Sequence, residues 1–174
     1  GSYHTCARLS DSTLKCWGSN SQGRLGDGSQ TERTTPVAVS GISNATQVSL
    51  GSSHNCARLS DSTVGCWGAN YYGQLGDGST TNRLTPVAVS GISNATQVSL
   101  GNSHSCSVLD NSSVKCWGYN SRGQLGDGST TQRTTPVAVS GISNATQVSA
   151  GHEHSCARLS DSTVKCWGKG YEGQ

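Results

Sequence analysis

The sequence predicts an all-β protein made of β-propeller-type blades, each a sheet of four short antiparallel strands. The first observation is a stretch, Gly-x-x-His-x-Cys followed by nine residues and Cys-Trp-Gly, that starts at residues 1, 51, 101 and 151. The second is that the segments between these copies also repeat, so the period is 50 residues without insertion or deletion. The third is that no window shows sustained helical spacing of apolar residues. A fixed period of this length is typical of solenoids, propellers and arrays, and Gly-rich four-stranded units are typical of propeller blades.

The period divides the 174 residues into about 3.5 repeats. Repeat 1 covers residues 1–50 and lacks its first strand, repeats 2 and 3 cover 51–100 and 101–150, and residues 151–174 form a partial fourth repeat. Unpaired strand edges promote association between chains. We therefore expect a partner chain or further sequence to complete a ring or a longer array.

The unit around repeat 2 shows why four strands are expected. Residues 45–50 are rich in β-branched side chains and partly alternating, which predicts the first strand, and residues 54–59 predict the second. Residues 63–67 predict the third strand. The polar, Gly-containing stretch 69–84 predicts a long loop with little regular structure. Residues 86–89 predict a short fourth strand, whose proline suits a strand start or a sheet edge.

The cysteines supply covalent support for a small core. Only 32% of the residues are hydrophobic and there is no Phe or Met, which is a weak supply of buried area. If a turn with Asx chemistry centres on Asp61, Cys56 faces Cys66 with Cα atoms about 4.5–5.5 Å apart, inside the disulfide range of about 4.4–6.8 Å. The repeat symmetry then predicts four disulfides, Cys6–Cys16, Cys56–Cys66, Cys106–Cys116 and Cys156–Cys166. Stable disulfides predict an oxidising, extracellular or cell-surface location.

The combined motif is Gly-x-x-His-x-Cys-Ala-x-Leu…Val-x-Cys-Trp-Gly-x-Asn-x-x-Gly-Gln-Leu-Gly-x-Gly…Pro-Val-x-Val. It resembles the repeat of the regulator of chromosome condensation family, in the cysteine-bearing form found in bacteria, and the resemblance covers the whole chain. The resemblance implies a seven-bladed β-propeller of four-stranded blades, of which this chain would be a part. Members of the family include nuclear exchange factors, a plant light receptor and a secreted inhibitor of β-lactamases. The resemblance therefore implies a platform that binds other proteins and does not fix the function.

Several function classes are disfavoured by charge and composition. The net charge of +2 is too small to predict nucleic-acid or membrane-surface binding, and no basic stripe exists. No apolar run approaches the length of a transmembrane helix. No set of nucleophile, base and orienting acid stands outside the repeated skeleton. We expect neither an enzyme nor a bound cofactor.

Repeated residues that resemble known sites have simpler structural explanations. A histidine precedes a cysteine by two residues in every repeat, at His4, His54, His104 and His154. Zinc sites bring cysteines at shorter spacing, so we expect each ring to bond to backbone within its own blade. The recurring Gly-Asp-Gly at 26–28 supplies one carboxylate, too few for calcium, and precedes no helix and Lys that would cradle a phosphate. The four tryptophans could be sugar or nucleic-acid platforms, but their fixed place beside a cysteine favours packing between blades.

The repeats differ in two short places: residues 2 and 3 of the repeat, directly after the leading Gly, and the three or four residues after Trp-Gly. In a four-stranded antiparallel blade the connections from strand one to two and from three to four lie at the same end. Both variable places therefore fall on one face, which is a common way to build a binding surface. This candidate binding face contains all five tyrosines and two charged residues: Tyr3, Tyr71, Tyr72, Tyr119, Arg122, Tyr171 and Glu172. Neutral variation of exposed loop tips is the alternative explanation.

Four triplets match the N-glycosylation acceptor pattern, at Asn44, Asn94, Asn111 and Asn144. We expect them on the face opposite to the tyrosines. A chain rich in Ser, Thr and Asn produces such triplets by chance, and a bacterial cell would usually leave them unmodified.

Together these features predict a secreted or surface-exposed structural and scaffolding repeat protein, which assembles with itself or with another protein. One alternative is a soluble propeller that acts as a protein-binding inhibitor or ligand-binding module through its tyrosine-bearing loops. A regulator of the guanine-nucleotide-exchange type ranks lower, because paired cysteines fit a reducing compartment poorly.

Overall fold

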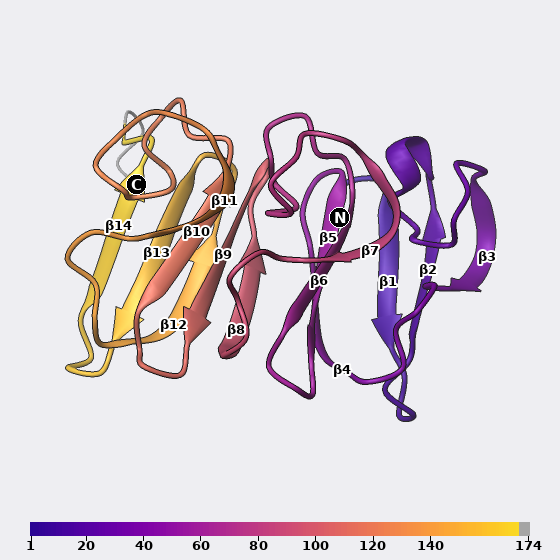
Figure 1. Cartoon of the computed structure of the whole chain (residues 1–174), viewed down its shortest axis with the longest axis horizontal. Helices are drawn as coiled ribbons and strands as arrows, with labels where there is room; N and C mark the ends of the chain where they lie inside the picture. Colours follow the sequence, from indigo (N-terminus) through magenta and orange to yellow (C-terminus); the bar gives the residue numbers. More distant parts are fainter. Residues whose placement is uncertain (171–174) are drawn as a thin grey trace.

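The computed structural model describes residues 1–170 and consists of four antiparallel sheets that stand side by side (Figure 1). Two sheets have four strands and two have three, and strands that follow one another in the chain are neighbours in each sheet. The prediction of an all-β chain of propeller-type blades is confirmed. Apart from the strands, the described residues contain one 3-10 helix, η1 (Ser21–Gly23).

The strands take the following bounds. The first sheet contains β1 (His4–Arg8), β2 (Leu14–Gly18) and β3 (Arg33–Ala38). The second contains β4 (Ala45–Leu50), β5 (His54–Leu59), β6 (Val64–Gly68) and β7 (Arg83–Ala88). The third contains β8 (Ala95–Leu100), β9 (His104–Leu109), β10 (Val114–Gly118) and β11 (Arg133–Ala138). The fourth contains β12 (Ala145–Ala150), β13 (His154–Leu159) and β14 (Val164–Gly168).

Each central hairpin closes through a local turn and a disulfide. Asp61 Oδ1 accepts hydrogen bonds from the backbone N–H (3.0 Å) and the hydroxyl (2.6 Å) of Thr63, so the expected Asx turn is confirmed. The resulting register pairs Cys56 with Cys66. Their Cα atoms lie 4.1 Å apart, somewhat closer than the sequence geometry suggested, and the two residues form a disulfide. The other three cysteine pairs form the same bond.

The fourth strand of a blade begins earlier than the sequence indicated. β7 starts at Arg83 instead of at Pro86, and the third strand, β6, is displaced by one residue from the predicted 63–67. The pairing of β6 with β7 is irregular between Cys66 and Gly68, which are matched to Val87 and Arg83. Pro86 falls in the irregular part of an edge strand, where the missing N–H breaks no ladder bond. The expectation of an edge position for the proline is confirmed, and the bounds of the third and fourth strands were wrong.

The core is divided into layers between neighbouring sheets. Trp67, fully buried, packs with Leu14 and Leu25 of the preceding blade, and Trp117 occupies the same place one blade later. The cysteines of the first three disulfides belong to these layers as well. Gly76 has a φ of +71°, and a Cβ there would lie 2.7 Å from Trp117 Nε1, so the close approach of loop and indole requires glycine. Packing between blades is confirmed for Trp67, Trp117 and Trp167, while Trp17 belongs to none of these layers.

The hairpin connections sort to two ends of the blades, which Figure 1 shows as an upper end with long loops and a lower end with tight turns. We call the upper end the loop face. It is formed by residues 19–32, 51–53, 69–82, 101–103 and 119–132, which connect first to second strands or third to fourth strands. The lower end carries the Asx turns and the connections between blades. No helix in residues 1–170 is both long and apolar enough to cross a membrane.

Replacing Trp117 by Ala should lower the free energy of unfolding by about 3–5 kcal/mol, because the fully buried indole leaves a cavity between two sheets. Urea unfolding followed by circular dichroism measures the change. Trp17, which is only partly buried, gives the matched control, and Trp17→Ala should cost clearly less. Equal losses for the two variants would show that the inter-sheet layer is not what stabilises the fold.

Candidate functional site

A polar latch joins each blade to the next and fixes the loop face. Ser105 Oγ donates to the backbone carbonyl of Gln74 (2.8 Å), and Trp117 Nε1 donates to the same carbonyl (2.9 Å). His54 Nε2 lies 3.0 Å from Ser105 Oγ. Since the serine proton is used toward Gln74, the histidine donates through Nε2–H, which defines its tautomer. One carbonyl of a loop is therefore held by two side chains of the following blade.

The same latch recurs at the other blade junctions. Between the first two sheets, Asn55 Nδ2 and Trp67 Nε1 both donate to the carbonyl of Arg24, at 2.6 and 3.1 Å, and Asn55 Oδ1 accepts from His4 at 2.6 Å. The pattern recurs between the last two sheets, where Ser155 and Trp167 both donate to the Gln124 carbonyl. There His104 Nε2 bonds to Ser155 Oγ. Each histidine ring was expected to bond to backbone within its own blade, and for His4, His54 and His104 this was wrong. The partner is a side chain 51 residues later, which no local pattern could reveal.

Hydrogen bonds also join the first strands of neighbouring blades, β4, β8 and β12, which we call the inner strands. The side-chain amide of Gln47 donates to the Val98 carbonyl and accepts from the Val98 N–H, both at 3.0 Å. The N–H of Leu100 donates to Ser49 Oγ at 3.2 Å. Gln97 and Ser99 make the corresponding bonds to the next inner strand. These bonds hold the blades at a fixed spacing, so the loops they carry keep their relative positions.

The long loop of each blade is ordered by one asparagine and one aspartate. Asn70 Oδ1 accepts from the Leu75 N–H at 2.9 Å, while its Nδ2 donates to Asp77, Ser79 and Thr81. Asp77 also forms an ion pair with Arg83, with 2.7 Å between Oδ2 and the guanidinium. Burial raises the pKa of Asp77, but hydrogen bonds from Ser79 and Arg83 outweigh it and leave the pKa lowered. The Gly-Asp-Gly motif therefore serves loop geometry, and the loop is more ordered than the sequence indicated.

The buried histidines are neutral structural groups. Burial, with smaller contributions from neighbouring histidines, lowers the pKa of His54 to about 3 and that of His104 to about 4. Their Nδ1 atoms have no hydrogen-bond partner among the described residues. Within residues 1–170, no three His, Cys, Asp or Glu side chains come together in a way that could hold a metal ion.

The structure gathers some of the predicted face residues and separates others. The rings of Tyr72 and Tyr119 are 4.7 Å apart between centroids, and Tyr71 stands beside them with 58% of its surface exposed. Tyr3 is 71% exposed and belongs to the first sheet, outside this cluster. Arg122 lines a separate depression together with Lys169. Tyr171 and Glu172 lie outside the described residues.

A groove with a volume of about 340 Å³ runs along the tyrosine cluster. We call it the tyrosine groove. Its lining comes from three consecutive repeats: Gln22, Ser52, Ser53, Ala69, Tyr71, Tyr72, Gln74, Asn102 and Ser103. Most of these positions fall in the two variable places that the sequence comparison singled out. Gln74 was missed, because repeats 2, 3 and 4 all carry glutamine there and it was assigned to the shared skeleton.

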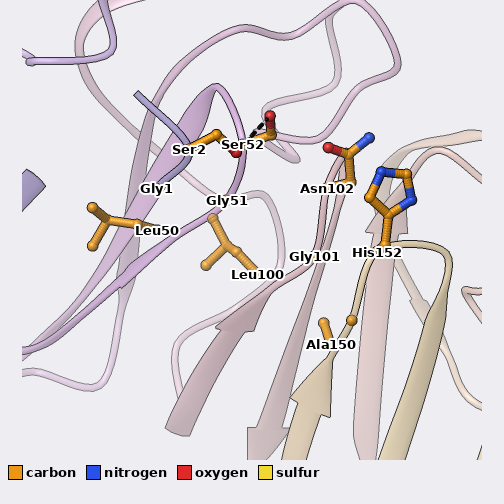
Figure 2. A pocket seen from close by; sticks show the side chains of 11 residues that line it. Gly1, Ser2, Leu50, Gly51, Ser52, Leu100, Gly101, Asn102, Ala150 and His152 are labelled. Atoms are coloured by element: carbon orange, nitrogen blue, oxygen red, sulfur yellow. Dashed lines mark hydrogen bonds between the residues drawn. The ribbon is translucent and has the colours of Figure 1, made fainter. Parts of the chain in front are cut away.

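A second hollow of about 340 Å³ lies where the inner strands end. Figure 2 shows Ser2, Ser52, Asn102 and His152 along its rim, each from the same place in its repeat. Apolar side chains of Leu50, Leu100 and Ala150 stand behind them. Ser52 and Asn102 line this hollow and the tyrosine groove alike, so the two depressions form one recessed area of the loop face.

The four acceptor asparagines lie at the lower end. Asn44, Asn94 and Asn144 directly precede inner strands, and Asn111 holds an Asx turn through bonds from Ser113. Asn44 Nδ2 donates to Ser60 Oγ at 3.3 Å. Their modification stays a prediction.

The blade pattern can now be compared with known proteins. The model of the regulator of chromosome condensation (RCC1) repeat matches residues 14–58, 62–108 and 113–158, and a second model of this repeat matches 1–24, 45–74, 95–124 and 145–174. The chain belongs to the RCC1 repeat family. The hydrogen bonds described above therefore join neighbouring RCC1-type blades of this chain. A search of curated proteins finds no match.

Solved structures share the fold of this RCC1-type chain at low sequence identity. Human WBSCR16 is 20% identical, with a TM-score of 0.88 over 99% of this chain and 47% of its own. Yeast RCC1 (Prp20), solved with Kap60, is 19% identical, with a TM-score of 0.85 over 98% of this chain and 42% of its own. Prp20p from Saccharomyces cerevisiae is 20% identical, with a TM-score of 0.80, covering 98% and 44%. The RCC1-type chain spans less than half the length of these structures.

Acidification should weaken the fold between about pH 6.5 and pH 4.5. His54 and His104 have folded-state pKa values of about 3 and about 4, below the unfolded value of about 6.5. The unfolded chain therefore binds more protons in this range, and stability present above pH 6.5 is lost as the pH falls. Urea midpoints at pH 7.5 and 4.5 measure the loss.

Replacement of the buried histidines tests this assignment. The double variant His54→Gln, His104→Gln should show a smaller change in urea midpoint over this range, whereas Ser60→Ala, at the exposed lower end, should keep the full change. The pKa of the Asp77 carboxyl is lowered, so the loss of stability that follows its protonation occurs only at more acidic pH. A wild-type midpoint that does not move between pH 7.5 and 4.5 would contradict the assignment of neutral buried histidines.

Proposed function

We propose that this chain is a rigid, non-enzymatic scaffold that works outside the cell or at its surface and binds another protein through its loop face. The observation that carries the proposal is the division between a constant frame and variable loops. Latch, disulfide and loop-ordering residues recur from repeat to repeat, while exposed aromatic side chains gather at one end, around Tyr71 and Tyr72. Rigid aromatic side chains on ordered loops are effective contact groups because little conformational entropy is lost on binding.

The relatives support protein binding as the class of function. One related structure shows yeast RCC1 (Prp20) bound to Kap60, and another concerns binding of Prp20p to Gsp1p and histones. We carry over only the use of the blade scaffold to hold proteins, since identity near 20% supports no shared partner. The exchange-factor alternative ranks below the scaffold, because four disulfides suit an oxidising compartment better than the nucleus.

Self-association is the second candidate, and the contacts between blades favour it. The bonds from Gln47 to Val98 and from Ser49 to Leu100 use side chains that each of the three full-length repeats carries. A blade of another chain with the same repeat would offer the same backbone groups. A structural polymer of this kind would leave the tyrosines in contact with neighbouring subunits or with nothing. A diffusible inhibitor would place one discrete partner on Tyr71, Tyr72 and Tyr119.

Replacing Tyr71, Tyr72 and Tyr119 together by Ser should remove binding of the protein partner while the fold is retained, because the exposed rings supply the contact area. Secreted and cell-surface proteins of the source organism are captured on the immobilised chain and quantified by mass spectrometry. Ser60→Ala with Ser160→Ala, at the lower end, serves as the control and should capture the wild-type set. The same proteins captured in the same amounts by the tyrosine variant would contradict the proposed function.

Self-association should appear as a concentration-dependent mass above that of one chain in light scattering of the oxidised protein. Gln147→Ala with Ser149→Ala removes the groups that correspond to Gln47 and Ser49 and should reduce the mass. Thr146→Ala is the control, because its hydroxyl donates to the Arg158 carbonyl within the same blade. A mass of one chain at every concentration would rule the second candidate out.

A further inference from the structure

We propose that the tyrosine groove is a binding site for neutral carbohydrate, an inference that rests on the proposed role of the loop face in recognition and names a ligand class for it. Three features of the groove point to this chemistry. It holds an amide donor in a fixed position, it presents exposed aromatic rings, and its described lining residues carry no formal charge.

The amide of Gln74 is a pre-positioned hydrogen-bond donor. The residue is only 3% exposed, its Oε1 accepts the Tyr72 N–H at 2.9 Å, and its carbonyl is held by the latch from Ser105 and Trp117. These bonds fix the side chain at the groove, which it lines. The amide nitrogen Nε2 carries two N–H groups. A ligand oxygen placed beside it would accept a hydrogen bond from an amide whose position is already set, so little conformational entropy is lost on binding.

Further polar groups surround this donor. The hydroxyls of Ser52, Ser53 and Ser103 and the amides of Gln22 and Asn102 line the groove. Hydroxyl and amide groups both donate and accept hydrogen bonds, which matches sugar hydroxyls, since each of these also donates and accepts. Within residues 1–170, the side chain of Asn102 makes one long hydrogen bond, 3.4 Å to Ser103 Oγ, which is weak enough for the amide to turn toward a ligand.

The tyrosines supply the complementary surface. Tyr71 and Tyr72 are 58% and 39% exposed, and Tyr72 is supported from behind by Tyr119 at 4.7 Å. The face of an aromatic ring carries negative charge density, whereas the C–H groups on one side of a pyranose ring are slightly positive and apolar. A sugar ring can therefore stack on these tyrosines while its hydroxyls reach Gln74 and Asn102. The groove volume of about 340 Å³ falls in the usual range for small-ligand sites, about 300–1,000 Å³.

A peptide or an anionic polymer fits the groove less well. Peptide recognition commonly uses free backbone groups of a sheet edge or a charged pocket. Here the loop backbone is already satisfied: the Tyr72 N–H by Gln74, the Gly73 N–H by Asn70 and the Asn70 N–H by Asn82. An anionic ligand would call for Lys or Arg, and none is present among the described lining residues. Side-chain hydroxyls and amides are what remains for recognition.

The test uses the oxidised chain on a printed array of neutral glycans that end in glucose, galactose, mannose or N-acetylhexosamine. Sialylated and sulfated glycans and a proline-rich peptide are printed as comparison classes. We expect retention on neutral glycans, and calorimetry with the strongest of them then gives the affinity. Tyr72→Ser and Gln74→Glu should each weaken binding about tenfold, the effect of losing one stacked ring or one hydrogen bond.

Two further variants make the result decisive. Asn102→Ala changes a partly exposed side chain and should also weaken binding if the groove is the site. Tyr3→Ser removes a tyrosine of the same chain that lies outside the groove, and it should bind as the wild type does. If the free glycan releases captured proteins from the immobilised chain, the natural ligand is the sugar of a glycoprotein. If the chain binds an unconjugated polysaccharide instead, the natural ligand is a free polymer. Either result supports the assignment.

Three outcomes would overturn the carbohydrate assignment: no retention on any neutral glycan, stronger retention on the anionic glycans or the peptide, or unchanged affinity for both Tyr72→Ser and Asn102→Ala. The proposed protein-binding function fails separately. It is tested by capture from fractions that have first been enzymatically deglycosylated, so that a partner still lost by the triple tyrosine variant would preserve that function without the sugar site.

Discussion

The arrangement of the blades depends on hydrogen bonds such as those to the backbone carbonyl of Gln74. It belongs to the loop of one blade, and Ser105 and Trp117 of the next blade both donate to it. Loss of the Ser105 hydroxyl would leave the Nε2–H of His54 without its acceptor, and a buried polar group left unsatisfied costs about 1–3 kcal/mol. His54 in turn orients the serine. Because the latch recurs at each blade junction described, one local geometry sets both the stacking of the sheets and the position of every loop.

A frame fixed in this way allows its loops to differ without loss of order. Asn70 and Asp77 hold the long loop through side-chain bonds that do not involve the exposed tips. The tip positions, including Tyr71 and Tyr72, can therefore change from repeat to repeat at little cost to the fold. The same separation explains why a recognition surface can be placed on the loop face while the disulfides and tryptophans stay in the layers between sheets.

Interactions whose residues all lie within one hairpin could be predicted from the sequence. The Asx turn at Asp61 and the pairing of Cys56 with Cys66 involve residues at most ten positions apart, so spacing and turn chemistry were sufficient. The start of β7 was misplaced because the irregular pairing opposite Pro86 depends on the neighbouring strand. The partner of His54 was also misjudged, since Ser105 lies in the following blade.

The sequence alone therefore determined the blade: its four strands, its turn, its covalent clamp and the face on which variable residues emerge. These follow from a short period and from the alternation of hairpin connections, which are local properties of the chain. The tertiary structure alone decided which residues meet across blades. Gln22, Tyr72 and Asn102 line one groove although each comes from a different repeat, and Gln74 is held there by the Tyr72 N–H and by the donors of the next blade. The physical reason is that contacts between blades depend on how twisted sheets pack against each other. The sequence of one repeat does not specify the distance or angle to the next blade.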